Sequence, residues 1–126
     1  MTKRSSSIPS PGTIDRNWPH QVALAQDLCY AENYNLIRSF CEGNGLDYQT
    51  RSVQAIWPDR RYLDIRLHCF IDRASAELFQ AHFGGEFFDP KRDREGGTLR
   101  GPWRREGVWT RILESGPLKI PQFLRD

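Results

Sequence analysis

The sequence predicts one small α+β domain built around an antiparallel sheet. Its 126 residues fit a single domain that is long enough to bury a core without cross-links. Between residues 62 and 71 apolar and polar residues alternate almost without a break, which indicates a strand. Apolar residues recur at helical spacing over 31–42 and 72–83, and glycines follow both segments, which indicates two helices.

The first of these helices, over residues 31–42, is expected to bury one apolar stripe. The stripe consists of Leu36, Ile37, Phe40 and Cys41. Gly43-Asn44-Gly45 follows, and Gly and Asn readily adopt the left-handed backbone that ends a helix.

Two strands, over residues 48–57 and 62–71, are expected to pair as a hairpin. The turn between them, residues 58–61, begins with Pro and Asp, which favour turn geometry. In the second strand one set of side chains is expected to face the core: Leu63, Ile65, Leu67, Cys69 and Ile71. The alternate set is expected to face outward: Tyr62, Asp64, Arg66, His68 and Phe70.

The second helix is expected to start at Asp72, a good N-cap residue, with Ser75 in its first turn. It is predicted to end before Gly84-Gly85. A short strand over 86–88 follows, and Asp89-Pro90 ends it.

The segment before the first helix leaves two interpretations open. Alternation over residues 18–24 favours a strand, with Pro19 near its start, where a missing N–H is tolerated. Asn17 could instead cap a helix that continues through Leu28. We favour the strand, and the predicted topology depends on that choice.

The predicted order is strand, helix, strand, strand, helix, strand, and the two halves look alike. Residues 35–40 and 77–83 are similar amphipathic segments that both precede glycines. This order resembles the β-α-β-β-α-β arrangement of ferredoxin-like folds, over about residues 17–89. The resemblance implies an antiparallel sheet with two helices on one face and the other face open.

The two ends of the chain are expected to differ from this domain. Residues 1–16 are rich in Ser and Pro and are predicted to be a disordered leader. Residues 90–126 are predicted to form a basic, partly ordered C-terminal extension that includes a mobile loop over 91–105. Residues 89–126 hold nine basic and six acidic side chains. Trp109 and Ile112 are apolar enough to cover the open sheet face.

Catalytic chemistry finds little support in the sequence. The three cysteines, Cys29, Cys41 and Cys69, do not form a CxxC pair, and an odd number indicates reduced thiols in a cytoplasmic protein. Zinc-ligand spacing, a GxSxG elbow and glycine-rich phosphate loops are all missing. No apolar run is long enough to cross a membrane, and the start of the chain lacks the apolar region of a secretory signal. The sequence therefore predicts no catalytic residue, metal or cofactor.

Two hypotheses for function remain, from different classes. The first is a non-enzymatic interaction or regulatory module, a homodimer or a binder of another protein, that uses the open sheet face. The second is a module for single-stranded nucleic acid, because exposed aromatics stack bases and Arg meets phosphate. Both use the outward set on the strand over 62–71. The second also uses a basic set in the extension: Lys91, Arg92, Arg94, Arg100, Trp103, Arg104 and Arg105. A small hydrolase or isomerase that pairs His68 with Asp64 or Arg66 is a distant third.

Overall fold

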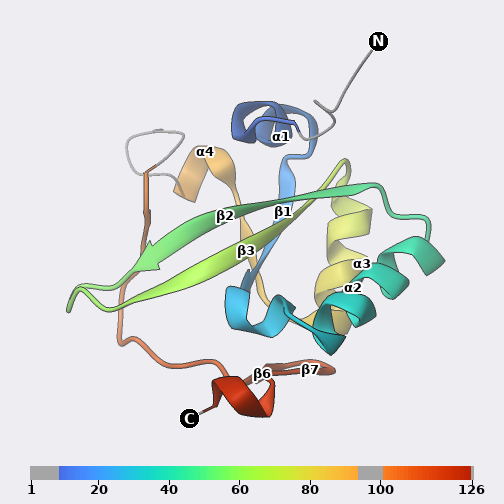
Figure 1. The fold of residues 1–126 in the computed structure, drawn as a ribbon. Helices are drawn as coiled ribbons and strands as arrows, with labels where there is room; N and C mark the ends of the chain where they lie inside the picture. Colours follow the sequence, from blue (N-terminus) through green and yellow to red (C-terminus); the bar gives the residue numbers. More distant parts are fainter. Residues whose placement is uncertain (1–8, 94–100, 126) are drawn as a thin grey trace.

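The computed structural model describes residues 9–93 and 101–125, which form a curled five-stranded sheet with helices around it (Figure 1). The helices and strands are α1 (Pro11–Asn17), β1 (His20–Ala25), η2 (Gln26–Cys29), α2 (Glu32–Gly43), β2 (Tyr48–Ile56), β3 (Tyr62–Phe70), α3 (Arg73–Phe83), β4 (Glu86–Phe88), α4 (Pro90–Asp93), β5 (Trp103–Arg104), β6 (Glu114–Ser115), β7 (Leu118–Lys119) and η4 (Gln122–Leu124). Within the described ranges, each helix is too short or too polar to cross a membrane.

The sheet confirms the α+β class but not the ferredoxin-like arrangement. Its strand order is β4-β1-β3-β2-β5, and the first four strands pair antiparallel with their neighbours. The fifth strand, β5, runs parallel to β2, with Trp103 opposite Ala55 and Arg104 opposite Ile56. The sheet is therefore mixed, and its strand order differs from the four-stranded antiparallel sheet that was expected. Two paired residues are too few to show any alternation, so the sequence could not indicate β5.

The segment before the first long helix is a strand, and the helical alternative is wrong. In β1 every residue from Gln21 to Ala25 is buried, as expected of a central strand that is covered on both faces. Pro19 lies immediately before the strand, where its missing N–H breaks no strand pairing.

The two long helices are confirmed, with small differences in their bounds. The Asp72 side chain caps α3, accepting a hydrogen bond of 2.8 Å from the Ser75 backbone N–H. The helix ends at Gly84, whose φ of +79° is unfavourable for other residues. In α2 the predicted stripe is only partly buried, because Ile37 and Cys41 face the core while Leu36 is exposed.

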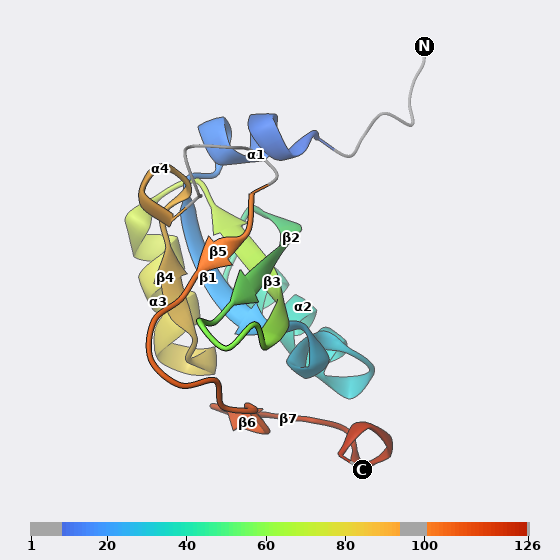
Figure 2. The ribbon, with the colours of Figure 1, turned by 90° about the vertical axis from the view of Figure 1, so that its left-hand side faces the viewer.

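Helices α2 and α3 cover one face of the sheet (Figures 1 and 2). A core cluster lies beneath them. His68 and Phe70, at the end of β3, are buried there, with ring centroids 5.0 Å and 5.2 Å from that of Phe79. The predicted outward orientation of these two residues is therefore wrong. Alternation separates the two faces of a strand, but it does not reveal which face the helices cover.

The opposite face of the sheet is also covered over much of its area, so the expected open face is not there. A second core cluster lies on it: Ile14, Ala23, Ala55, Ile65, Leu67, Cys69, Phe88 and Trp103. Ile14 comes from α1 and Trp103 from β5, and both elements lay outside the predicted sheet domain.

Helix α1 overturns the prediction of disorder for residues 11–16. Ser10 caps the helix, because its Oγ accepts a hydrogen bond of 3.2 Å from the Thr13 N–H. Pro11 follows at the first helical position, where proline is well tolerated. The rest of the predicted leader, residues 1–8, lies outside the described residues.

A buried polar group also links α1 to the sheet. Asp15 lies 3.7 Å from the Arg51 guanidinium of β2, and both side chains are almost fully buried. The Gln21 side-chain amide donates a hydrogen bond of 2.9 Å to the same carboxylate. These contacts give α1 a defined position on the second face.

The C-terminal segment, with β6 and β7, lies at the end of the domain beside η2 and the ends of α2 and α3 (Figure 1). Leu118 and Ile120 are buried in the first core cluster. The Asn33 side-chain amide donates a hydrogen bond of 2.7 Å to the carbonyl of Lys119, and the Ser115 hydroxyl donates one of 2.6 Å to the carbonyl of Phe83. The segment therefore completes the core on that side of the sheet.

Candidate functional site

A pocket of about 350 Å³ lies between the sheet and the start of α2. It contains two of the predicted site residues, Arg66 and His68, both from β3. Its lining comes from η2, α2, β2, β3 and the loop before α2: Cys29, Tyr30, Ala31, Tyr34, Ile37, Tyr48, Thr50, Arg66 and His68. We call this cavity the tyrosine pocket. Its volume is at the lower end of the range for sites that bind small molecules.

Three tyrosines give the pocket much of its aromatic surface. Tyr34 is 53% exposed and Tyr30 is 40% exposed, so both present ring surface to solvent. The hydroxyl of Tyr30 accepts a hydrogen bond of 2.8 Å from the Gln26 side-chain amide. Tyr48 is half-buried and stacks on His68, with ring centroids 6.3 Å apart. Aromatic faces at these positions can hold a planar ring.

The backbone between two of these tyrosines is strained. Ala31, which joins η2 to α2, has a φ of +55°, a value that L-residues other than Gly, Asn and Asp rarely adopt. Such a conformation costs about 1–3 kcal/mol and persists only where surrounding contacts impose it. The turn at Ala31 fixes the position of Tyr30 relative to Tyr34.

His68 has the most unusual environment of the lining residues. It is 3% exposed, and its Nδ1 has no hydrogen-bond partner among the described residues. Burial, and secondarily the nearby Arg66 charge, lower the pKa of His68 from 6.5 to about 3. The imidazole is therefore neutral at physiological pH. An unpaired polar atom in the interior costs about 1–3 kcal/mol, which a ligand that hydrogen-bonds to the ring would offset.

Arg66 supplies the positive charge of the pocket lining. It is only half-buried, and none of the described carboxylates forms an ion pair with it. A guanidinium at the edge of an aromatic pocket can bind a carboxylate or phosphate with two parallel hydrogen bonds.

The thiols of the chain are poorly suited to nucleophilic chemistry. Burial raises the pKa of Cys29, in the pocket, to about 12. Burial likewise raises the pKa values of Cys41 and Cys69 to about 12. Because the thiolate is the reactive form, these cysteines are almost fully protonated at neutral pH. Across the described part of the chain, His, Cys, Asp and Glu side chains do not gather in a group of three that could hold a metal.

The structure does not bring the five predicted residues of β3 together in one site. Arg66 and His68 line the tyrosine pocket, whereas Phe70 is fully buried in the core. Tyr62 and Asp64 are exposed near the start of the strand, outside the pocket. No sequence pattern indicates that Tyr30, Tyr34 and Tyr48 join Arg66, because they come from three other segments of the chain.

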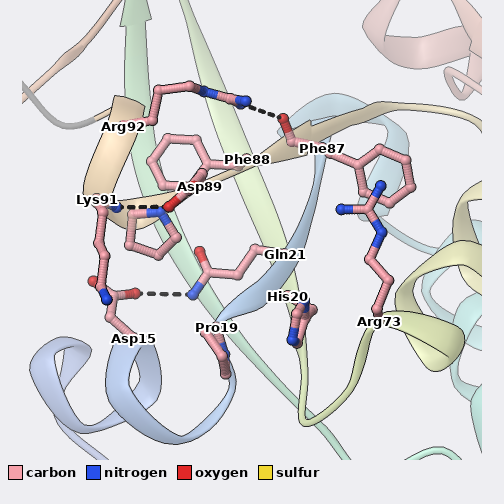
Figure 3. Close-up of a pocket in the computed structure, with 11 residues that line it drawn as sticks. Asp15, Pro19, His20, Gln21, Arg73, Phe87, Phe88, Asp89, Lys91 and Arg92 are labelled. Atoms are coloured by element: carbon pink, nitrogen blue, oxygen red, sulfur yellow. Dashed lines mark hydrogen bonds between the residues drawn. The ribbon is translucent and has the colours of Figure 1, made fainter.

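The predicted basic set in the extension is also divided. Lys91 and Arg92 belong to α4 and line a different cavity (Figure 3). Trp103 is buried against Phe88, with ring centroids 5.1 Å apart. Two more residues of the set, Arg94 and Arg100, lie outside the described residues.

The last two residues of that set, Arg104 and Arg105, follow the buried Trp103 in the chain. Arg104 is exposed. Arg105 donates a hydrogen bond of 2.7 Å to the Glu86 carboxylate, and its guanidinium lies 4.0 Å from the centre of the Trp103 ring. The described parts of the predicted mobile loop therefore include α4 and β5.

Comparisons of the chain with protein-family models, with curated proteins and with solved structures found no match. The side chains of the tyrosine pocket offer aromatic surface, one cation and one neutral imidazole. This combination can position a flat anionic molecule by stacking, charge and a hydrogen bond.

Proposed function

We propose that this protein is a small non-enzymatic binding module that holds one planar, anionic molecule in the tyrosine pocket. The observation that carries the proposal is the buried, neutral His68 beside Arg66. Among the described residues, His68 Nδ1 has no hydrogen-bond partner and Arg66 has no ion-pair partner. In this scheme the ring of the ligand contacts the tyrosines, its anion meets Arg66, and a polar atom of the ring meets His68.

Binding fits these groups better than catalysis does. A general base should have a pKa near the operating pH, and the pKa of His68 lies far below it, at about 3. The thiol of Cys29 is protonated, because burial raises its pKa to about 12. Neither group is therefore suited to proton transfer or nucleophilic attack at neutral pH.

A second candidate is the binding of single-stranded nucleic acid, with one base in the same pocket. The tyrosines and Arg66 favour it, because base stacking on aromatics and phosphate contacts to Arg are the main contacts of such proteins. Its affinity would fall with salt in proportion to the number of phosphates neutralised, with a log–log slope of about −0.7 per phosphate.

The experiment measures binding by titration calorimetry with two probes, adenosine monophosphate and 4-hydroxybenzoate. We expect Tyr34→Ala to weaken binding of at least one probe about ten-fold, which corresponds to one lost aromatic contact. Tyr62→Ala is the matched control, because Tyr62 is 54% exposed, Tyr34 is 53% exposed, and Tyr62 lies outside the pocket.

The charge is tested in the same way. Arg66→Ala should weaken binding ten-fold or more, whereas Arg61→Ala, which removes an exposed arginine outside the pocket, should leave it unchanged. Failure of both probes to bind, or equal losses for the pocket and control variants, would contradict the proposal. If an oligonucleotide binds more tightly than adenosine monophosphate, with a steep salt dependence, the second candidate replaces the first.

Association with another chain, and a cytoplasmic location, remain part of the proposal. Tyr62, Ile112 and Val108 are exposed apolar side chains that a homodimer or a protein partner could cover. Sedimentation that shows a monomer at all concentrations would remove the homodimer. The three free cysteines are compatible with a reducing compartment, and localisation of a tagged protein tests that point.

A further inference from the structure

A second cavity, of about 320 Å³, lies where β1 begins and β4 ends. Figure 3 shows its walls: Asp15 from α1, His20 and Gln21 from β1, Arg73 from α3, Phe87 and Phe88 from β4, and the α4 segment with Lys91 and Arg92. None of its described lining residues belongs to the tyrosine pocket. A ligand in this cavity would therefore bind at a site separate from the one proposed above.

Gln21 presents a buried acceptor at this cavity. The residue is 1% exposed, and its Nε2 donates hydrogen bonds of 2.9 Å to Asp15 Oδ1 and 3.1 Å to the carbonyl of Trp18. Two acceptors around Nε2 fix the orientation of the amide, because only the nitrogen can donate. The remaining atom, Oε1, has no partner among the described residues. In Figure 3 this oxygen points away from Asp15, on the side of Phe88 and Asp89.

The acceptor is held in place by its neighbours. Asp15 also lies 3.7 Å from the Arg51 guanidinium, and both side chains are almost fully buried. Rotation of the Gln21 amide would place an oxygen against the Asp15 carboxylate and lose two hydrogen bonds. The protein therefore maintains an unpaired acceptor that costs about 1–3 kcal/mol in the absence of a donor.

Lys91 adds an available positive charge. Its ammonium group forms no ion pair with any described carboxylate, whereas Arg92 pairs with Asp93 and Arg73 pairs with Glu77. The backbone of Lys91 is fixed, because its N–H donates a hydrogen bond of 2.9 Å to Asp89 Oδ1. In Figure 3 the side chain extends from α4 in the direction of α1, and its end is drawn beside Asp15.

We infer that this cavity binds a small molecule that carries a carboxylate or phosphate group together with an N–H or O–H donor. The anion meets Lys91, with the exposed guanidinium of Arg73 at the edge of the same cavity, and the donor meets Gln21 Oε1. The size of the cavity limits the ligand to one of roughly metabolite size.

Thermal unfolding of the full chain tests the inference with two probes, malate and glycerol 3-phosphate. Each carries an anion and a hydroxyl donor, and sodium chloride at matched ionic strength is the reference. Binding at ten times the dissociation constant should raise the Tm by about 5 °C. Stabilisation by malate alone indicates a carboxylate ligand, and stabilisation by glycerol 3-phosphate alone indicates a phosphate ester.

Lys91→Gln should weaken binding of the stabilising probe at least ten-fold, whereas Lys119→Gln, which removes an exposed lysine elsewhere, should not. Gln21→Met should also weaken binding of the stabilising probe. If Gln21→Met does not fold, the Lys91→Gln variant, at an exposed residue, tests the inference. The inference is overturned if neither probe raises the Tm above the chloride reference, or if Lys91→Gln keeps full affinity. Tyr34→Ala, which alters the tyrosine pocket, should not change binding of these probes. A failure of the inference can therefore be distinguished from a failure of the proposed function.

Discussion

His68 should make the protein less stable as the pH falls below neutrality. The group has a pKa of 6.5 in an unfolded chain and about 3 in the folded protein, mainly because burial disfavours the charged form. Between these values the unfolded chain binds one more proton than the folded protein. Stability therefore rises with pH across this window, and acid favours unfolding.

The size of the effect follows from the two pKa values. Between pH 7 and pH 5 the unfolded imidazole becomes almost fully protonated while the folded one stays neutral, which removes about 2 kcal/mol of stability. Side-chain carboxylates of the unfolded chain titrate near pH 4, so they contribute little above pH 5. A loss of this size is a considerable part of the stability of a small domain.

Urea unfolding of the wild-type protein and of His68→Phe, at pH 7 and pH 5, measures the effect. A phenyl ring retains the stacking on Tyr48 and Phe79 and removes both the titration and the unpaired Nδ1. We expect the variant to be at least as stable as the wild type at pH 7 and to lose about 2 kcal/mol less at pH 5. Tyr48→Phe, which keeps a ring stacked on His68 and leaves the imidazole in place, should lose as much stability as the wild type. Equal losses in the wild type and His68→Phe would refute the reasoning.

Three further predictions concern the elements that were not foreseen, each measured by urea unfolding at pH 7. Asp15→Ala should cost about 3 kcal/mol, because it leaves the buried guanidinium of Arg51 without this carboxylate; a loss below 1 kcal/mol would show that α1 is not anchored there. Gly116→Ala should destabilise the protein more than Gly45→Ala does. Both glycines have a positive φ, but only at Gly116 would a Cβ lie 2.5 Å from a backbone oxygen. Equal losses in the two variants would argue against the close contact between Gly116 and α3. Leu118→Ala should cost about 2–5 kcal/mol, because this fully buried side chain belongs to the first core cluster, and a surface-like value would mean that the C-terminal segment does not dock.

The elements that the sequence predicted well are those with local signals. The cap at Asp72 and the glycines after Phe83 determine α3 within a few residues, and the alternating pattern determines β3. The hairpin turn is equally local, since Asp59 Oδ1 accepts a hydrogen bond of 2.9 Å from the N–H of Arg61. Each of these features depends on residues that are close together in the chain.

The features that the sequence did not reveal depend on distant partners. The second core cluster joins Ile14 of α1 with Trp103 of β5, two residues that no local pattern connects. A strand with apolar residues on both faces is compatible with either face being covered by helices. For this reason alternation placed His68 and Phe70 outward, whereas the structure buries them against Phe79.

The same limit explains why only part of the candidate site could be predicted. Arg66 and His68 could be paired from the sequence because residues two apart in a strand share a face. The tyrosines could not be added, because Tyr30 and Tyr34 reach the pocket only through the turn at Ala31. The direction in which His68 faces then changes its chemistry. On an open surface it would be a titrating, solvent-exposed imidazole, whereas beneath the helices its pKa falls to about 3 and it remains neutral, which favours a hydrogen-bonding role over acid–base catalysis.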